Sequence, residues 1–179
     1  GCHDGIPMLD LKGILPEEDI QKLIALIVDR GGMVKNLHGQ KNVYYQVNAT
    51  YFSALGESEQ KLLLARAIQI FMPGKPQIWY LDLFAGKNDH EAVKEAGEGG
   101  HKEINRTNLT DIQIRQALRT DVVQKQLALL RFRSTSKAFT EDADIQIQSD
   151  GRKLMIRWSN SAAAAQLDVD FETGSYLIS

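Results

Sequence analysis

The sequence predicts an α/β part up to about residue 135, followed by a small antiparallel β part. Three observations predict this fold class. The run Gln77–Phe84 has the length and composition of a buried strand and no helical period. A strongly apolar helix candidate precedes it and a polar, glycine-containing loop follows, which is the order of elements in a parallel α/β sheet. After about Arg133, apolar and polar residues alternate, as in strands with one buried face.

Composition describes an ordinary globular chain. Its 179 residues are 43% hydrophobic and 25% charged. The net charge is -2 without a basic block, so nucleic acid is not an expected partner. No apolar stretch reaches the roughly 20 residues of a membrane span, so no membrane association is expected. The single cysteine excludes an intrachain disulfide and agrees with a reducing, cytoplasmic location.

The first helix is predicted from Pro16 to about residue 30, after an expected loop over residues 1–15. Proline suits the first helical turn, the acidic residues at 17–19 complement the positive end of the helix dipole, and Gly31–Gly32 end it. Apolar residues then recur at helical spacing: Ile20, Leu23, Ile24, Ile27 and Val28. Residues 33–46 show no period and are expected to form a long irregular loop.

The remaining helices of the α/β part are predicted from apolar content and caps. The segment 57–72 is apolar on nearly all sides and should be buried. Thr110 and Thr120 have the residue type of N-caps, so each is expected to begin a helix. The shorter predicted segments are helices over 47–55 and 88–96, and an irregular loop over 97–108.

The C-terminal part is predicted as a meander of about four short strands. Asp150-Gly151 is a hairpin turn signal between two of them. The alternating, core-facing positions are Ile145, Ile147, Leu154, Ile156, Trp158, Leu167, Val169, Phe171, Tyr176 and Ile178. We therefore divide the chain into an α/β part over residues 1–135 and a small β domain over residues 136–179.

Few residues carry obvious chemistry. His3-Asp4 places an imidazole beside a carboxylate, and Arg106 lies in a glycine-containing loop. The sequence has no metal-ligand spacing, no phosphate-binding glycine fingerprint and no nucleophile elbow, so no metal site is predicted. Tyr45-Gln46 combines a ring and an amide, which suits a polyhydroxylated ligand. A tyrosine that merely anchors the loop to the core is the alternative.

Taken together, five ordered motifs resemble the C-terminal portion of sucrose phosphorylases, a branch of the α-amylase superfamily. The motifs are His3-Asp4-Gly5, the stretch 45–55, Pro73-Gly74-Lys75-Pro76-Gln77, Ala85-Gly86-Lys87-Asn88-Asp89 and Ile104-Asn105-Arg106. The resemblance implies a (β/α)₈ TIM barrel, from the end of strand 7 through helix 8, followed by a small β-sheet domain. A complete barrel needs about 250 residues. The family's catalytic nucleophile and its acid/base would therefore lie upstream of this fragment.

The resemblance also implies roles for five residues. Asp4 resembles the third catalytic carboxylate, which stabilises the transition state. His3 resembles its neighbour that donates a hydrogen bond to a glucose hydroxyl. Arg106 matches the arginine that pairs with an upstream aspartate and closes the glucose pocket. Tyr45 and Gln46 match a mobile loop on the acceptor side.

The implied reaction is a retaining double displacement that converts sucrose and phosphate into α-D-glucose 1-phosphate and fructose. Inorganic phosphate is a co-substrate, and no metal or organic cofactor is implied. Asn42 and Val43 stand where the family has an acidic residue before the tyrosine pair, which leaves other acceptors open. The alternatives are a phosphorylase of sucrose 6'-phosphate or of a glucosylated glycerate, and a non-catalytic carbohydrate-binding fragment. The fragment alone is expected to be inactive, and homodimerisation is left open.

Overall fold

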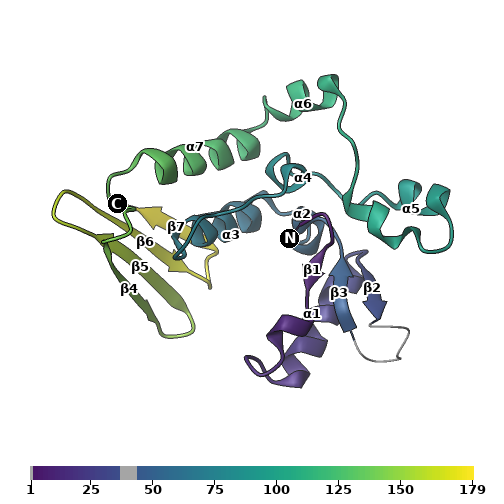
Figure 1. The fold of residues 1–179 in the computed structure, drawn as a ribbon, viewed down its shortest axis with the longest axis horizontal. Helices are drawn as coiled ribbons and strands as arrows, with labels where there is room; N and C mark the ends of the chain where they lie inside the picture. Colours follow the sequence, from purple (N-terminus) through teal and green to yellow (C-terminus); the bar gives the residue numbers. More distant parts are fainter. Residues whose placement is uncertain (1, 37–43) are drawn as a thin grey trace. The chain divides into compact units, whose positions relative to one another are not determined.

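The computed structural model describes residues 2–36 and 44–179, and its ribbon is shown in Figure 1. The chain forms two compact units, which are described separately. The first comprises Gly1–Ser58 and Ile78–Arg119, and the second comprises Glu59–Gln77 and Thr120–Ser179. The predicted domain boundary at residue 135 falls inside the second unit and does not separate the two compact units. The division into domains therefore stays a prediction.

The first helix of the first unit forms as the sequence predicts. Helix α1 spans Glu17–Asp29, with Pro16 before it and three acidic residues in its first turn. Its buried side chains are Ile20, Ile24 and Ile27. They pack with Met8 and Val47 in one apolar cluster, so the i, i+4, i+7 spacing of the helix positions its core face. Val28, which the sequence assigned to that face, is 41% exposed.

Two segments predicted as loops contain strands instead. Strands β1 (Ile6–Pro7), β2 (Met33–Asn36) and β3 (Tyr44–Asn48) form an antiparallel sheet in the order β1-β3-β2. Val47, fully buried in the central strand, pairs with both Ile6 and Val34. The strands span only two, four and five residues, so the local sequence gives little signal, and cross-strand partners stabilise them. Residues 37–43 of the predicted loop lie outside the described residues.

The expected central strand over 77–84 is wrong. Residues 77–79 have no strand assignment, and helix α4 (Tyr80–Leu83) follows with Leu81 and Asp82 buried. A hydrogen bond from the backbone N–H of Gly86 to the carbonyl of Leu81 ends this short helix. An apolar run without a period is compatible with either element, and no strand in residues 2–36 or 44–179 pairs with it. All named strand pairs in these ranges are antiparallel, so the expected parallel pairing is absent from them.

The other elements of this unit follow their caps. Helix α2 begins after Thr50, whose side chain accepts a hydrogen bond from the Ser53 N–H. Helix α6 begins after Thr110, which forms a capping box with Gln113. Only the second half of the segment 47–55, which was predicted as a helix, is helical, because its first residues belong to β3. The bounds are η1 Leu9–Leu11, α2 Tyr51–Ala54, α5 His90–Ala96, η3 Gly100–Asn105 and α6 Asp111–Ala117.

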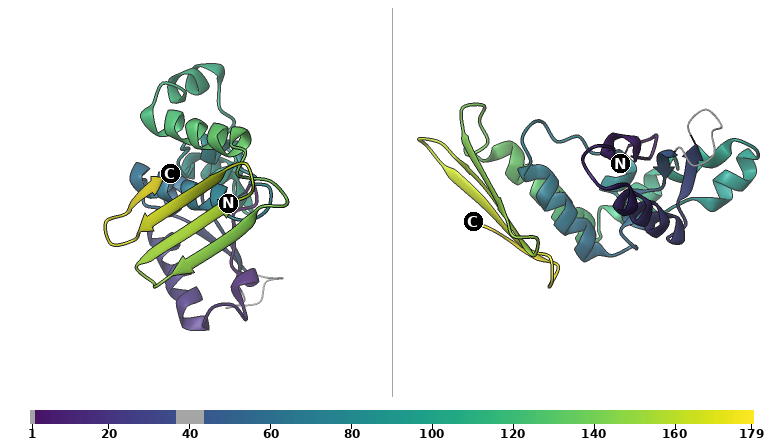
Figure 2. Two further views of the ribbon diagram at one scale, coloured as in Figure 1. Left: turned by 90° about the vertical axis from the view of Figure 1, so that its left-hand side faces the viewer. Right: turned by 90° about the horizontal axis from the view of Figure 1, so that it is seen from below.

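The second unit is a four-stranded antiparallel sheet with two helices, which confirms the predicted meander. Two positions predicted to face the core do not, because Ile147 is 49% and Phe171 is 45% exposed. Helix α3 (Glu59–Phe71) packs against the sheet and against α7 (Asp121–Thr135), as two views in Figure 2 show. The strands lie in sequence order: β4 Asp144–Ser149, β5 Lys153–Ser159, β6 Ala164–Asp170 and β7 Ser175–Ile178. The expected α/β part with a small antiparallel sheet after it is therefore present.

Trp158 connects the sheet to helix α3. Its side chain is 5% exposed, and its Nε1–H donates to the carbonyl of Phe71, at the end of α3, over 2.7 Å. The ring of Phe139 lies edge-on to it, and the guanidinium of Arg133 lies 4.2 Å from the centroid of Phe139 and 4.6 Å from that of Trp158. This burial places the indole in the core rather than on a sugar-binding surface.

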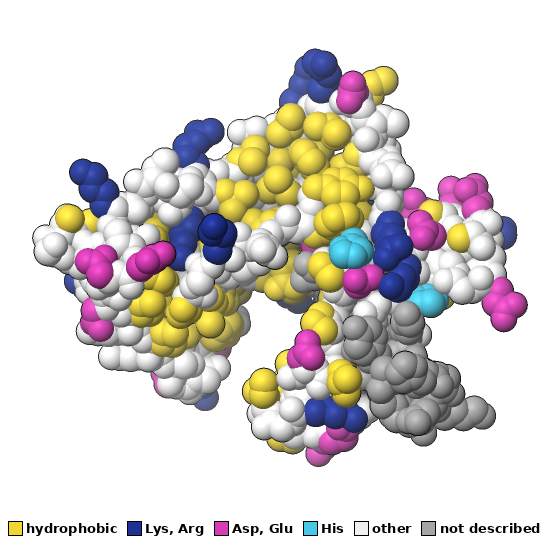
Figure 3. Space-filling view, viewed as in Figure 1, with side chains coloured by type: hydrophobic (Ala, Val, Ile, Leu, Met, Phe, Trp, Pro, Cys, Tyr) yellow, Lys and Arg dark blue, Asp and Glu magenta, His cyan; other side chains and the backbone are white. Residues whose placement is uncertain are grey.

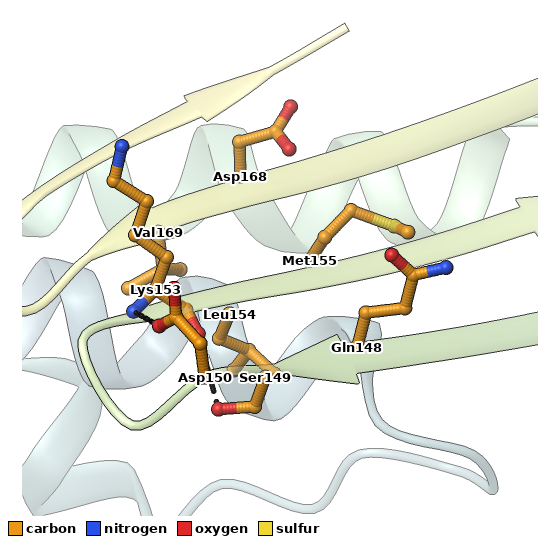
Figure 4. A pocket seen from close by; sticks show the side chains of 8 residues that line it. All are labelled: Gln148, Ser149, Asp150, Lys153, Leu154, Met155, Asp168 and Val169. Carbon is orange, nitrogen blue, oxygen red and sulfur yellow. Dashed lines mark hydrogen bonds between the residues drawn. The ribbon is translucent and has the colours of Figure 1, made fainter.

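The outer face of the same sheet is polar and shallow. Figure 4 shows Gln148, Met155 and Asp168 on adjacent strands, in the register that the strand pairing fixes. At the β4–β5 hairpin, the carboxylate of Asp150 accepts from the backbone N–H groups of Arg152 and Lys153. These bonds lower the pKa of Asp150 and show that this carboxylate stabilises the turn. Among the described residues, no helix is both long and apolar enough to cross a membrane.

We predict that Trp158→Phe lowers the free energy of unfolding by about 1–3 kcal/mol, because the buried carbonyl of Phe71 loses its donor. Urea unfolding followed by circular dichroism measures this change. Leu177→Ala is the control, since Leu177 lies on the same sheet with 64% exposure and should change stability by less than about 0.5 kcal/mol. Equal stability of Trp158→Phe and the unsubstituted protein would show that the indole hydrogen bond contributes nothing.

Candidate functional site

The site is built on a tight turn near the N-terminus. The backbones of Cys2 and Gly5 exchange two hydrogen bonds, of 3.2 and 3.0 Å, so His3 and Asp4 occupy the two central positions of the turn. Gly5 has a φ of +111°, and a Cβ atom there would lie 2.6 Å from the carbonyl oxygen of Val47. Only glycine fits both the conformation and the close approach to β3. The side chains of His3 and Asp4 therefore project together from the tip.

Side chains from two distant segments hold the backbone carbonyls of this turn. The carbonyl of Asp4 accepts from the side-chain amides of Gln46 and Asn48 on β3, over 2.7 Å for Asn48. The carbonyl of Cys2 accepts from Nδ2 of Asn105 over 2.8 Å. All three amide residues are at most 4% exposed. Buried amides of this kind orient a peptide firmly, because an unmade hydrogen bond costs about 1–3 kcal/mol there.

Two cations from the segment around η3 approach the carboxylate of Asp4. Lys102 Nζ lies 2.7 Å and Arg106 Nη2 lies 3.2 Å from the same oxygen, Oδ1. The other oxygen, Oδ2, lies 3.1 Å from Nε2 of His3. Arg106 also donates from Nε to the carbonyl of His3 over 3.0 Å. The carboxylate thus has one oxygen paired with cations and one shared with an imidazole.

This environment keeps Asp4 ionised. The hydrogen bond from Lys102, with the charges of Lys102, His3 and Arg106, lowers the pKa of the Asp4 carboxyl and outweighs the opposing effect of burial. The side chain of Asp4 is 42% exposed, so a solute can reach it. A carboxylate that stays ionised and accessible can interact with sugar hydroxyls or with developing positive charge.

Aromatic side chains form one wall of the site. The His3 ring lies 5.6 Å, centroid to centroid, from that of Trp79, and Trp79 in turn contacts Tyr80 edge-on at 4.6 Å. Trp79 Nε1–H donates to the carbonyl of Asn105, which connects this wall to η3. In the space-filling view, histidine, basic and acidic side chains gather near the N-terminal end, next to hydrophobic surface (Figure 3).

The structure brings together three of the five predicted site residues. His3, Asp4 and Arg106 meet at the turn. Gln46 lies behind the turn, where its amide donates to the carbonyl of Asp4. Tyr45 belongs to strand β3, but its side chain lies outside the described residues. Their roles in binding or catalysis stay predictions.

Sequence reasoning assigned no role to three residues of the site: Asn48 and Asn105, which lie within two of the motifs, and Lys102, which lies in none of them. Each is a common polar residue whose role comes from a contact with a segment far along the chain. One local signal was available for β3. Gln46 and Asn48 flank the apolar Val47, and this period of two places both amides on one face of a strand.

A metal ion at this turn is electrostatically disfavoured. Ligand atoms of Cys2, His3 and Asp4 lie within 4.8 Å of one another. Lys102 and Arg106 already pair with Asp4, however, and each would repel a bound cation at close range. The arrangement therefore fits a carboxylate that works in its ionised, ion-paired form.

Comparisons with known proteins give a consistent result. A sucrose 6(F)-phosphate phosphorylase of Ilumatobacter coccineus is 50% identical over 187 residues, which covers 99% of this chain and 36% of that protein. A sucrose phosphorylase of Streptococcus mutans is 35% identical over 158 residues, covering 86% of this chain and 32% of that one. The chain thus spans about a third of the length of these curated relatives. No family model matches the sequence.

A solved structure agrees with these relatives. The crystal structure of sucrose 6F-phosphate phosphorylase from Thermoanaerobacter thermosaccharolyticum has a TM-score of 0.91 and 36% identity to this chain. The match covers 99% of this chain and 36% of that one, in its C-terminal part. At this identity, the likeness reflects common ancestry as well as a common fold.

We predict that Asp4 stabilises the folded protein in a pH-dependent way. Its folded pKa is lowered, so its stabilising contribution is present above the unfolded pKa and is lost as the pH falls through the folded pKa. The stability difference between the unsubstituted protein and Asp4→Asn should therefore be largest near pH 7. It should be below about 1 kcal/mol, because solvent screens a half-exposed pair, and should shrink at acidic pH. Thermal unfolding from pH 3 to 7 measures it, and a difference that grows on acidification would contradict the lowered pKa.

Proposed function

We propose that this chain, which corresponds to the C-terminal part of the sucrose-type glucoside phosphorylases, supplies the groups that hold the transferred glucosyl unit in such an enzyme. The observation that carries this proposal is the Asp4 carboxylate. It is ionised by its neighbours, half exposed, and presents an oxygen beside an imidazole at the tip of a rigid turn. The sequence identity to phosphorylases, which extends over almost the whole chain, supports the same proposal.

The proposed reaction is a retaining double displacement. An upstream carboxylate attacks the anomeric carbon of the glucosyl unit, an upstream acid protonates the departing oxygen, and phosphate then takes the glucosyl group. In this scheme Asp4 accepts hydrogen bonds from sugar hydroxyls, which strengthen as positive charge develops on the ring. Inorganic phosphate is the co-substrate, and the scheme needs no metal ion or organic cofactor.

The other predicted residues have separate roles in this proposal. His3 donates a hydrogen bond to a hydroxyl next to the one that Asp4 holds. Arg106 closes the pocket behind the sugar, at the edge where it already contacts the turn. Tyr45 contributes to the acceptor side, where phosphate and the leaving sugar alternate. Gln46 does not act on the acceptor side in this proposal but supports the turn, since its buried amide donates to the carbonyl of Asp4.

We propose that the glucosyl donor is sucrose or sucrose 6(F)-phosphate. Phosphorolysis would release α-D-glucose 1-phosphate together with fructose or fructose 6-phosphate, respectively. The two named relatives and the solved structure divide between these donors. A glucosylated glycerate is the runner-up. A non-catalytic carbohydrate-binding role finds less support, because the indole of Trp158 is 5% exposed. The 179-residue chain alone should be inactive, since the nucleophile and the acid/base are proposed to lie upstream.

The test uses the complete gene product that contains this sequence. We expect phosphate-dependent release of α-configured glucose 1-phosphate from sucrose, from sucrose 6(F)-phosphate, or from both, measured by ³¹P and ¹H NMR. The ratio of the two kcat/KM values identifies the donor. Release from glucosylglycerate alone would select the runner-up, and phosphate-independent hydrolysis of every donor would contradict phosphorolysis.

We further predict that Asp4→Asn in the complete protein lowers kcat by at least about 10²–10³, the scale for a group directed at transition-state charge. KM for the glucoside should change much less, and the circular dichroism spectrum should stay the same. Asp10→Asn is the matched control, because Asp10 is an exposed acid in η1 of the same compact unit. Near-normal turnover by Asp4→Asn would show that the His3-Asp4 turn is not part of the catalytic site.

A further inference from the structure

Lys102 makes the shortest described contact with the Asp4 carboxylate. Its Nζ lies 2.7 Å from Oδ1, against 3.2 Å for Arg106 Nη2, and its own side chain is 30% exposed. Both cations approach the same oxygen. Oδ2 is left to Nε2 of His3, at 3.1 Å. The carboxylate is therefore held asymmetrically, with a basic edge and an edge that faces the imidazole.

We propose that Lys102 is a positioning residue, which fixes Oδ1 of Asp4 so that Oδ2 and His3 form the edge that holds the glucosyl hydroxyls. This inference rests on the proposed function and adds a residue that lies outside the five motifs. Lys102 itself does not touch the sugar in this scheme. It acts through the orientation of Asp4 and through the charge that keeps that carboxylate ionised.

The surroundings of Lys102 suit a fixed support. Ile104 and Asn105, two and three residues after Lys102 in η3, are 0% and 1% exposed, so the C-terminal end of η3 is anchored in the core. Asn105 also holds the carbonyl of Cys2 in the turn. Lys102 and the His3-Asp4 turn are thus both held by the buried end of η3. A short ion pair between two anchored segments defines a carboxylate rotamer better than one between mobile side chains.

Arg106 is less suited to this task because its guanidinium is shared. Besides Asp4, it contacts the carbonyl of His3 at 3.0 Å and Glu103 at 3.9 Å. In the proposed enzyme it would also pair with an upstream carboxylate to close the pocket. When Arg106 turns toward that partner, Lys102 remains on Oδ1, and Asp4 keeps one cation throughout the cycle. This explains why two positive charges share one oxygen despite their mutual repulsion.

The experiment compares Lys102→Met and Lys102→Arg in the complete gene product. Methionine keeps the length of the side chain and removes its charge, and arginine keeps the charge. We expect Lys102→Met to lower kcat by about 10- to 100-fold, the scale for small misplacements of a catalytic group. KM for the glucoside and KM for phosphate should change far less. Lys102→Arg should recover most of the lost kcat.

Lys22→Met is the matched control, because Lys22 forms an ion pair of the same length, 2.7 Å, with Glu18 on α1. It should leave kcat unchanged. Thermal unfolding checks that each variant folds, and Lys102→Gln replaces Lys102→Met if the latter does not.

The outcomes separate this inference from the proposed function. Normal kcat for Lys102→Met in an active enzyme overturns the inference alone, as does equal loss in Lys102→Met and Lys102→Arg. A raised KM for phosphate with unchanged kcat also overturns it, because Lys102 would then bind phosphate directly. If the wild-type protein phosphorolyses no glucoside, both the proposed function and this inference are wrong.

Discussion

The geometry of the site depends on the hydrogen bonds that side chains make to the backbone of the His3-Asp4 turn. The carbonyls of Cys2, His3 and Asp4 each accept from a side chain of β3 or of the η3 segment. The amide donors are buried, so an amide that lost its carbonyl would not regain a hydrogen bond from water, and this cost holds the turn in place. Gly5 adds a steric condition, since its backbone approaches β3 too closely for any side chain. The direction of the Asp4 carboxylate follows from these contacts.

In the proposed function, the charges around Asp4 balance two requirements. A carboxylate stabilises a positively charged transition state best when its own charge is not cancelled, yet an isolated carboxylate in a binding pocket tends to take up a proton. Placing both cations on Oδ1 keeps the acid ionised while leaving Oδ2 free of them. The partial exposure of all four side chains moderates the attraction, because water screens it.

Local signals in the sequence predicted the elements that local interactions stabilise. Helices α1 and α6 follow their first-turn acids and caps, and the C-terminal meander follows its alternation and the Asp150-Gly151 turn. Strands β2 and β3 were missed because their stability comes from partners far along the chain. The run 77–84 was misassigned for a different reason, because an apolar run without a period is compatible with a strand or a helix. In the site, the family resemblance implied roles for His3, Asp4 and Arg106. Asn48 and Asn105 lie in the same motifs and Lys102 lies outside them, but all three acquire a role only once the chain is folded.

The long separations between contacting residues have a consequence for folding kinetics. Asn48 reaches Asp4 across 44 positions, and Asn105 reaches Cys2 across 103. Closing such loops loses chain entropy before any of the site's hydrogen bonds forms, and contacts of this separation slow folding. Helices α1 and α5 can form early from nearby residues, but the turn acquires its shape only when both distant segments have docked. We therefore expect the Asp4 site to be completed late in the folding of this unit, after both distant segments have docked.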